Sequence, residues 1–275
     1  MITTATFPPR QRSAQSEKEV CRVKISELTA AMDSWAPFDT AQDFDNCGLL
    51  VGDKNAETDC VLLALDLTDE VLSEAERIGA GAVITHHPLI FRAQKRFTAD
   101  GLPFRAARLG IAVIGCHTNL DIAPQGVNDT LISLLGLEKI GEVLGTGGCC
   151  AMCACPKELS SPKELARRVK DAVGLPCVRL ADGKKPVKRV AVCCGGGASF
   201  IDAAVSDGAD AMITGDIKYA SAVDAVREGF TLVDAGHYET ERIVLPVIEK
   251  RLSSEFEDCR FVIARSCRSA FEYIL

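Results

Sequence analysis

Short apolar runs alternate along this chain with longer amphipathic segments. Cys60–Leu67 and Ala82–Thr85 are almost wholly apolar, as is typical of parallel strands buried on both faces. Between them, Asp69–Ile78 has the spacing of an amphipathic helix, with Thr68 placed to cap its start and Gly79 to end it. This alternation of strands and helices predicts an α/β fold with mostly parallel sheets.

The same pattern places further elements on both sides of this segment. We expect a short strand and an amphipathic helix over Val23–Trp35, a short strand after the polar turn Asp45–Gly48, a helix over Leu102–Leu109, a strand over Ile111–Gly115 and a helix over Gly126–Leu135.

The second part of the chain repeats the first. Gly208–Thr214 resembles Gly79–Thr85 at an offset of 129 (208 − 79), and Gly229–His237 resembles Gly110–His117. A chance match of such short segments is the alternative. A duplication would give two related α/β halves, and it would place corresponding strand ends on either side of a shared cleft.

These observations predict four segments. Residues 1–20 form a polar leader that we expect to be disordered, and residues 21–137 form the first α/β half. Residues 138–188 are a connecting segment with one helix, which starts at Ser161 or Pro162 and ends at Val173. Residues 189–275 form the second half.

Composition narrows the class of protein. The chain has 275 residues with a net charge of −7, and its pI near 5.3 argues against nucleic acid as the main partner. No segment has the ~18 consecutive apolar residues of a membrane span, and the N-terminus lacks an apolar signal core. The thirteen cysteines, several of them in adjacent pairs or apolar runs, suit reduced core thiols. We therefore expect a cytoplasmic protein.

The four histidines lie in three polar segments that follow apolar runs. His86 and His87 come directly after Ala82–Thr85, and both can face one site only if the chain leaves the sheet there. Pro88 favours that exit, because it donates no hydrogen bond within a sheet. Two imidazoles at a strand end suit two neighbouring metal ions, and a structural pair without a metal is the alternative.

The other two histidines each precede a carboxylate by four residues. His237 and Glu241 would lie on one face if a helix begins near His237, and Glu241 could then bridge two ions. Asp121 could supply an oxygen ligand, with His117 either a ligand or a hydrogen-bond donor that orients one. This mixture of imidazoles and carboxylates suits Zn, Mn, Fe or Ni better than Ca or Mg.

Two further motifs have alternative readings. Cys193–Ser199 is a glycine-rich turn between a strand and a helix, which could hold a substrate phosphate or could be a tight turn without a ligand. The cysteine-rich run Cys149–Cys155 could hold zinc, but no C-x-x-C pair follows it at the spacing of a zinc ribbon.

Five motifs in order resemble the signatures of the NIF-three-like family, whose bacterial members are often labelled type-two GTP cyclohydrolase one homologues. They are Asp45–Leu49, Thr85–Leu89, His117–Asp121, Thr214–Tyr219 and Asp234–Glu241. The resemblance runs from about Val23 to the C-terminus. The length is similar to that of the short form, which lacks the ferredoxin-like domain inserted in longer members.

The resemblance implies a toroidal homohexamer in which each chain holds two divalent metal ions in a cleft between two related α/β halves. The ligands that it implies are His86, His87, Asp121, His237 and Glu241, with Glu241 bridging both ions. It does not include His117 among them. Many relatives have a histidine where this chain has Ala220, and this departure puts any inherited activity in question.

The leading hypothesis is a metal-dependent hydrolase that acts on a small nucleotide-like substrate. A reaction of the GTP cyclohydrolase type would open the imidazole ring of the purine. His117 or Asp66 is a candidate proton carrier, on position alone. The alternatives are a non-enzymatic metal-binding or regulatory protein and a phosphoesterase.

Overall fold

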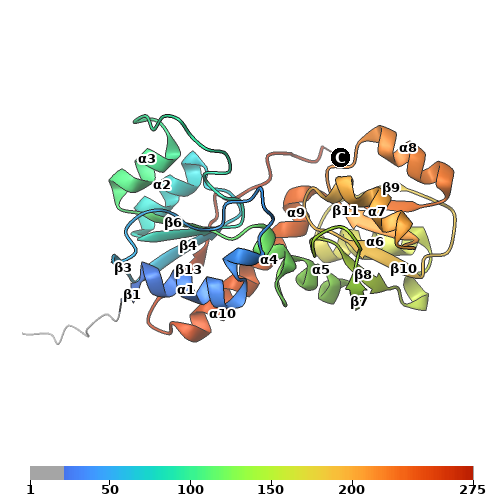
Figure 1. Cartoon of the computed structure of the whole chain (residues 1–275), viewed down its shortest axis with the longest axis horizontal. Helices are drawn as coiled ribbons and strands as arrows, with labels where there is room; N and C mark the ends of the chain where they lie inside the picture. The colour runs from blue at the N-terminus through green and yellow to red at the C-terminus, as the bar shows by residue number, and fades with distance from the viewer. Residues whose placement is uncertain (1–21, 275) are drawn as a thin grey trace, which may run out of the picture.

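Two β-sheets, each covered by helices on both faces, form the molecule (Figure 1). The computed structural model describes residues 22–274, so the expected leader at residues 1–20 lies outside the described residues. A small additional pair, β1 (Val23–Lys24) and β3 (Glu57–Thr58), is antiparallel.

The first sheet has the strand order β13-β4-β5-β6-β2, and only β2 is antiparallel to its neighbour. Its strands are β2 (Gly48–Val51), β4 (Cys60–Ala64), β5 (Ala82–Thr85), β6 (Ala112–Gly115) and β13 (Arg260–Ile263). Successive side chains point to opposite faces of a strand. Val61 and Leu63 therefore pack towards α1 (Ile25–Trp35) and α10 (Leu245–Glu255). Leu62 on the other face packs towards α2 (Asp69–Ile78) and α3 (Leu102–Leu109).

The second sheet has the strand order β7-β8-β10-β11-β12-β9. Its strands are β7 (Glu138–Glu142), β8 (Ala151–Ala154), β9 (Arg179–Ala181), β10 (Arg189–Val192), β11 (Ala211–Thr214) and β12 (Thr231–Asp234). One face packs against α5 (Val127–Leu135) and α6 (Pro162–Val173). The other packs against α7 (Ile201–Ser206) and α8 (Tyr219–Glu228). A single hydrophobic cluster includes Val61 of the first sheet and Val190 of the second, so the two sheets share a core.

Short helical segments complete the chain. They are η1 (Phe38–Thr40), α4 (Thr118–Ile122), η2 (Lys157–Leu159), η3 (Gly197–Phe200), α9 (His237–Glu241) and η4 (Arg242–Val244). Figure 1 places α4 and α9 between the two sheets. No helix between residues 22 and 274 has both the length and the apolar content needed to span a lipid bilayer.

Local sequence signals fixed several element ends as predicted. Helix α2 spans Asp69–Ile78, because Thr68 Oγ1 accepts a hydrogen bond from Val71 N at 3.3 Å and Gly79 adopts the left-handed conformation with φ 73°. Strand β5 and helices α3 and α6 also have the predicted bounds. The mixed α/β fold is confirmed.

The sheets divide the chain differently from the expected halves. The segment 138–188 supplies β7, β8 and β9 to the second sheet, while β13 of the expected second half pairs with β4 in the first. The second sheet has three antiparallel pairs (β7–β8, β8–β10 and β12–β9) and two parallel ones, so it is mixed rather than mostly parallel. All five residues of β7 are exposed, so it carries no apolar alternation by which the sequence could reveal it.

Glu74 of α2 holds the segment that follows β13. Its side chain is 7% exposed and accepts hydrogen bonds from Ser266 N at 2.8 Å, Ser266 Oγ at 2.6 Å and Arg265 N at 3.3 Å. Burial by itself raises the pKa of this carboxyl, but these bonds outweigh it and hold the pKa below its ordinary value. The ionised carboxylate is thus the form that stabilises the native chain.

Replacement of Glu74 with glutamine is expected to destabilise the protein by about 1–3 kcal/mol at pH 7, because a charge-assisted hydrogen-bond acceptor is lost. A folded-state pKa below the unfolded one gives stability that is present above the unfolded value of ~4.3 and is lost as pH falls through the folded pKa. The gap between wild type and Glu74→Gln in urea unfolding should therefore shrink between pH 7 and pH 3. Glu76→Gln, an exposed site on the same helix, is the control. A gap that is constant with pH would contradict this assignment.

Candidate metal centre

The predicted site residues follow the carboxyl ends of neighbouring strands. His86 and His87 follow β5, and His117 follows β6 and precedes α4, which carries Asp121. Strands β5 and β6 are parallel and adjacent, so their ends meet at one edge of the first sheet. Helix α9, after β12 of the second sheet, carries the remaining predicted residues, His237 and Glu241.

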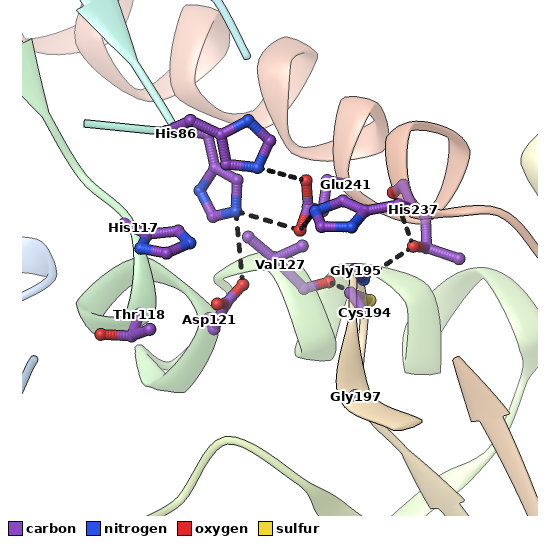
Figure 2. A network of polar contacts seen from close by, with 12 residues as sticks. His86, His117, Thr118, Asp121, Val127, Cys194, Gly195, Gly197, His237 and Glu241 are labelled. Carbon is purple, nitrogen blue, oxygen red and sulfur yellow. Dashed lines mark hydrogen bonds and ion pairs between the residues drawn. The ribbon is translucent and has the colours of Figure 1, made fainter. Parts of the chain in front are cut away.

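The carboxylate of Glu241 lies among three imidazoles. Its Oε1 is 3.5 Å from His86 Nε2 and 3.1 Å from His237 Nε2, and its Oε2 is 3.0 Å from His87 Nε2. Asp121 Oδ1 lies 3.6 Å from His86 Nε2 on the other side (Figure 2). The structure thus brings together all five residues that the sequence motifs indicated.

The Nδ1 atom of each histidine forms a hydrogen bond with an oxygen acceptor. Nδ1 donates a hydrogen bond in every case: from His86 to Cys116 O at 2.9 Å, from His87 to Asp66 at 2.8 Å, from His117 to Asp45 at 2.9 Å and from His237 to Asp216 at 2.7 Å. A hydrogen bond of this kind fixes the tautomer and the ring orientation, and it leaves Nε2 as the nitrogen that can bind a cation.

Sequence reasoning missed Asp45 and Asp216 as partners of histidines. Asp45 lies in the motif Asp45–Leu49, but 72 residues separate it from His117, and no local pattern links the two. Asp216 is the residue that replaces the second histidine of the pair in the repeated segment, and that correspondence was the available signal.

The imidazoles and carboxylates shift one another's pKa values. Burial alone would lower the pKa of His87, but Asp66 and Glu241 outweigh it and raise that pKa to about 10. The hydrogen bond to Glu241 raises the pKa of His237 to about 9. Burial raises the pKa of Asp121 to about 6. Burial would also raise the pKa of Glu241, but His86 and His237 hold it well below its usual range. The cluster therefore attracts positive charge, as protons or as cations.

Three buried atoms of this cluster lack hydrogen-bond partners within residues 22–274: His86 Nε2, Asp121 Oδ1 and Glu241 Oε2. Unpaired buried polar atoms are costly, and such groups in a native protein call for an explanation. Nitrogen and carboxylate oxygen are ligands for Zn, Mn, Fe or Ni, so the residues present fit a metal.

Among the described residues, two groups have ligand atoms within 4.8 Å of one another: His86, His87 and His117, and His87, His237 and Glu241. His117 was not among the ligands carried over from the resemblance. Its ring centroid nevertheless lies 5.3 Å from that of His86 and 5.6 Å from that of His87. Asp121 is outside both groups, although it is close to His86 Nε2.

The glycine-rich turn after β10 packs against the cluster and uses its own amides. Gly195 N donates to Thr240 Oγ1 at 2.9 Å, and Gly197 N donates to Thr214 Oγ1 at 2.9 Å. This pattern favours a tight turn over a phosphate site. Gly195 has φ +68°, and a Cβ there would overlap Glu241 Oε1. The turn therefore lets the backbone approach the carboxylate closely.

The cysteine-rich run contributes no thiol to the candidate metal groups of the described residues. Cys149, Cys150 and Cys153 are buried, and burial raises the pKa of Cys149 and of Cys153 to about 12. Within the part of the chain that the structure describes, none of these thiols belongs to a group that could hold a metal ion. They fit the reading as small core residues.

A cavity of about 1010 Å³ opens beside His87 and His237. Its walls include Asp66 and Leu102 beside the first sheet, Cys177 and Glu239 beside the second, and the C-terminal residues 268–271 and 273. A cavity of this size can hold a small molecule. It is the space through which a substrate could reach the imidazoles.

The fold and the site define an α/β protein with a partly buried cluster of histidines and carboxylates between its two sheets. The model of the family Duf34/NIF3 (NGG1p interacting factor 3) matches residues 23–269, and the chain belongs to this family, as the motifs predicted. The GTP cyclohydrolase 1 type 2 homolog of Clostridium perfringens is 32% identical over 263 residues, which cover 92% of this chain and all of that protein. The homolog of Lactococcus lactis is 34% identical and covers 83% of this chain and 91% of its own.

Solved structures show the same likeness. A hypothetical protein of Staphylococcus aureus superposes with a TM-score of 0.81 at 29% identity, covering 91% of this chain and 99% of its own. Reduced HcgD from Methanocaldococcus jannaschii superposes with a TM-score of 0.80 at 29% identity, covering 90% of this chain and all of its own.

Proposed function

We propose that this protein is a metal-dependent hydrolase that holds two divalent ions, Zn, Mn, Fe or Ni, between its two sheets. His86, His87, Asp121, His237 and Glu241 would hold these ions, with Glu241 as the ligand shared by both. The observation that carries this proposal is the buried Glu241 carboxylate within 3.5 Å of three Nε2 atoms.

We further propose that the two sheets derive from a duplication. The segments β4-α2-β5-α3-β6 and β10-α7-β11-α8-β12 have the same element order. Val61 pairs with Ala82 in the first sheet and Val190 with Ala211 in the second, so the register follows the offset of 129. Asp121 then follows β6, and His237 and Glu241 follow its counterpart β12, in a cleft between related halves. The family resemblance leads us to propose a cytoplasmic homohexamer as well.

The substrate that we propose is GTP or a related nucleotide, whose purine ring is opened by hydrolysis. The names of the relatives support this class of reaction, and the cavity beside His87 and His237 has room for such a molecule. When bound, two ions at this position would lower the pKa of a water molecule and polarise the carbon that it attacks.

His117 is the better of the two candidate proton carriers. Its Nδ1 donates to Asp45, and its Nε2 faces the same cluster as His86 and His87. Although burial alone would raise the pKa of Asp45, hydrogen bonds from His117 and Thr118 hold it below its usual range, so this carboxylate stays ionised and fixes the ring. Asp66 accepts the Nδ1 proton of His87 and so positions a ligand.

Metal-loaded protein is expected to convert GTP with release of formate. Asp45→Asn should reduce that turnover by about 100-fold or more, because His117 loses its anionic partner, while metal content stays unchanged. Asp43→Asn, an exposed residue nearby, is the matched control. Formate can be quantified enzymatically, and metal by elemental analysis.

A fully loaded protein that releases no formate from GTP contradicts the cyclohydrolase function. Release of phosphate instead would identify a phosphoesterase. The non-enzymatic alternative has one specific observation in its favour: Ala220, where many relatives have a histidine, is an exposed residue at the start of α8 and can carry no proton. Bound metal without any converted substrate would support that alternative.

A further inference from the structure

Glu239 is a buried residue whose carboxylate is not among the proposed metal ligands. Its side chain is 7% exposed and lines the 1010 Å³ cavity. Within residues 22–274 it has no hydrogen-bond or ion-pair partner. The neighbouring Asp234, by contrast, accepts bonds from Arg179, Ile217 N and Gly236 N. Its oxygens are not among the buried atoms that lack partners, so the carboxylate is accessible from the cavity, where a ligand could supply donors.

The place of Glu239 on α9 separates it from the metal ligands. His237 and Glu241 lie four residues apart and share one face of the helix. Glu239 lies midway, about 200° around the helix from each of them. It belongs to neither group of residues that could hold a metal ion in the described chain. Its carboxylate is therefore available to a molecule in the cavity.

Tyr273 lies near this carboxylate, and a second aromatic residue lines the same cavity. A Cβ on Gly236 would overlap Glu239 Oε2 and would lie 3.5 Å from Tyr273 Oη, so the carboxylate and the phenol flank the same glycine. Phe271, which is 81% exposed, lines the same cavity. Both rings belong to the C-terminal segment, which Tyr238 fixes by donating a hydrogen bond to Cys267 O at 2.7 Å. Exposed aromatic faces of this kind stack on the rings of nucleobases.

We propose that Glu239 determines substrate specificity by accepting paired N–H donors from a guanine-type ring. Such a ring presents a ring N–H next to an exocyclic amino group, and a carboxylate can accept both in parallel, as it does from a guanidinium. Phe271 or Tyr273 supplies the stacking face. This assignment rests on the proposed function, since it names the group by which that cavity selects its nucleotide.

The test compares the binding of guanosine with that of inosine, which lacks the amino group, by calorimetry on metal-loaded protein. Wild type is expected to bind guanosine about tenfold or more tightly, because a charge-assisted hydrogen bond is lost with inosine. Glu239→Gln should bind both about equally and keep its metal content. Glu255→Gln, an exposed residue on α10, should keep the preference.

Wild-type protein that binds guanosine no more tightly than inosine, or that does not bind guanosine, overturns the assignment. An unchanged preference in Glu239→Gln overturns it too. A structural role alone would lower the melting temperature of this variant without changing the ratio of the two affinities. Selective binding without formate release would support the role of Glu239 and refute the cyclohydrolase function. Formate release without a preference for guanosine would refute only the proposed role of Glu239.

Discussion

Replacement of Glu241 with alanine is expected to abolish metal binding. This carboxylate is 3% exposed, and it is the group that joins the imidazoles of the first sheet to His237 of the second. Its removal leaves three Nε2 atoms without their shared anion. Loss of a residue that only orients a ligand typically weakens a metal site 10- to 100-fold, so loss of Glu241, the proposed bridging ligand, should reduce affinity by more than about 100-fold.

Elemental analysis of the purified variant measures this loss, and circular dichroism shows whether the fold remains. Glu255→Ala, an exposed glutamate on α10, should retain the metal content of wild type. Addition of a chelator to wild type should reproduce the state of the variant, because chelation removes the same ions. Full occupancy in folded Glu241→Ala protein would show that the ions are bound elsewhere, and the site would have to be reassigned.

The sequence could predict that the candidate ligands lie together, because their residue types coincide there with a regular spacing. A histidine pair directly after a buried strand, and a histidine and a carboxylate four residues apart, both reveal their orientation through local spacing. The partners of the Nδ1 atoms could not be predicted in this way. His117 and Asp45 are 72 residues apart, and they meet only because Asp45 precedes β2, which pairs with β6.

The edge strands of the second sheet could not be predicted from local sequence either. Strands β4, β5 and β6 were predictable because burial on both faces makes them apolar throughout. Strand β7 is exposed along its length, and β9 has only three residues. Neither has a pattern that distinguishes it from a loop. Their membership of the second sheet is decided by long-range pairing with β8 and β12, which local propensity does not encode.

Glu239 went unnoticed for a related reason. In the sequence it is one acidic residue within Asp234–Glu241, a motif in which the histidine and the last carboxylate attract attention. Its significance depends on what surrounds it: burial, a cavity and the lack of any donor from the described chain. Only the fold reveals such an absence.

Gly195→Ala is expected to disrupt the metal site without changing any ligand. A Cβ at this position would overlap Glu241 Oε1 and would lie 3.0 Å from Glu241 Cδ and 3.2 Å from His237 Nε2. The carboxylate must move, because the backbone of the turn is fixed by the hydrogen bond from Gly195 N to Thr240. We expect metal affinity to fall at least about tenfold, as measured by titration of the metal-free protein.

The control for this variant separates crowding from backbone strain. Gly195 has φ +68° and Gly79 has φ +73°, so an alanine is similarly strained at both and should cost about 1 kcal/mol of stability. A Cβ on Gly79, however, would meet no atom within 4 Å. Gly79→Ala should therefore lose stability but keep its metal affinity. Equal metal affinity in the two variants would mean that the turn after β10 does not shape the site, and that Glu241 has room to adjust.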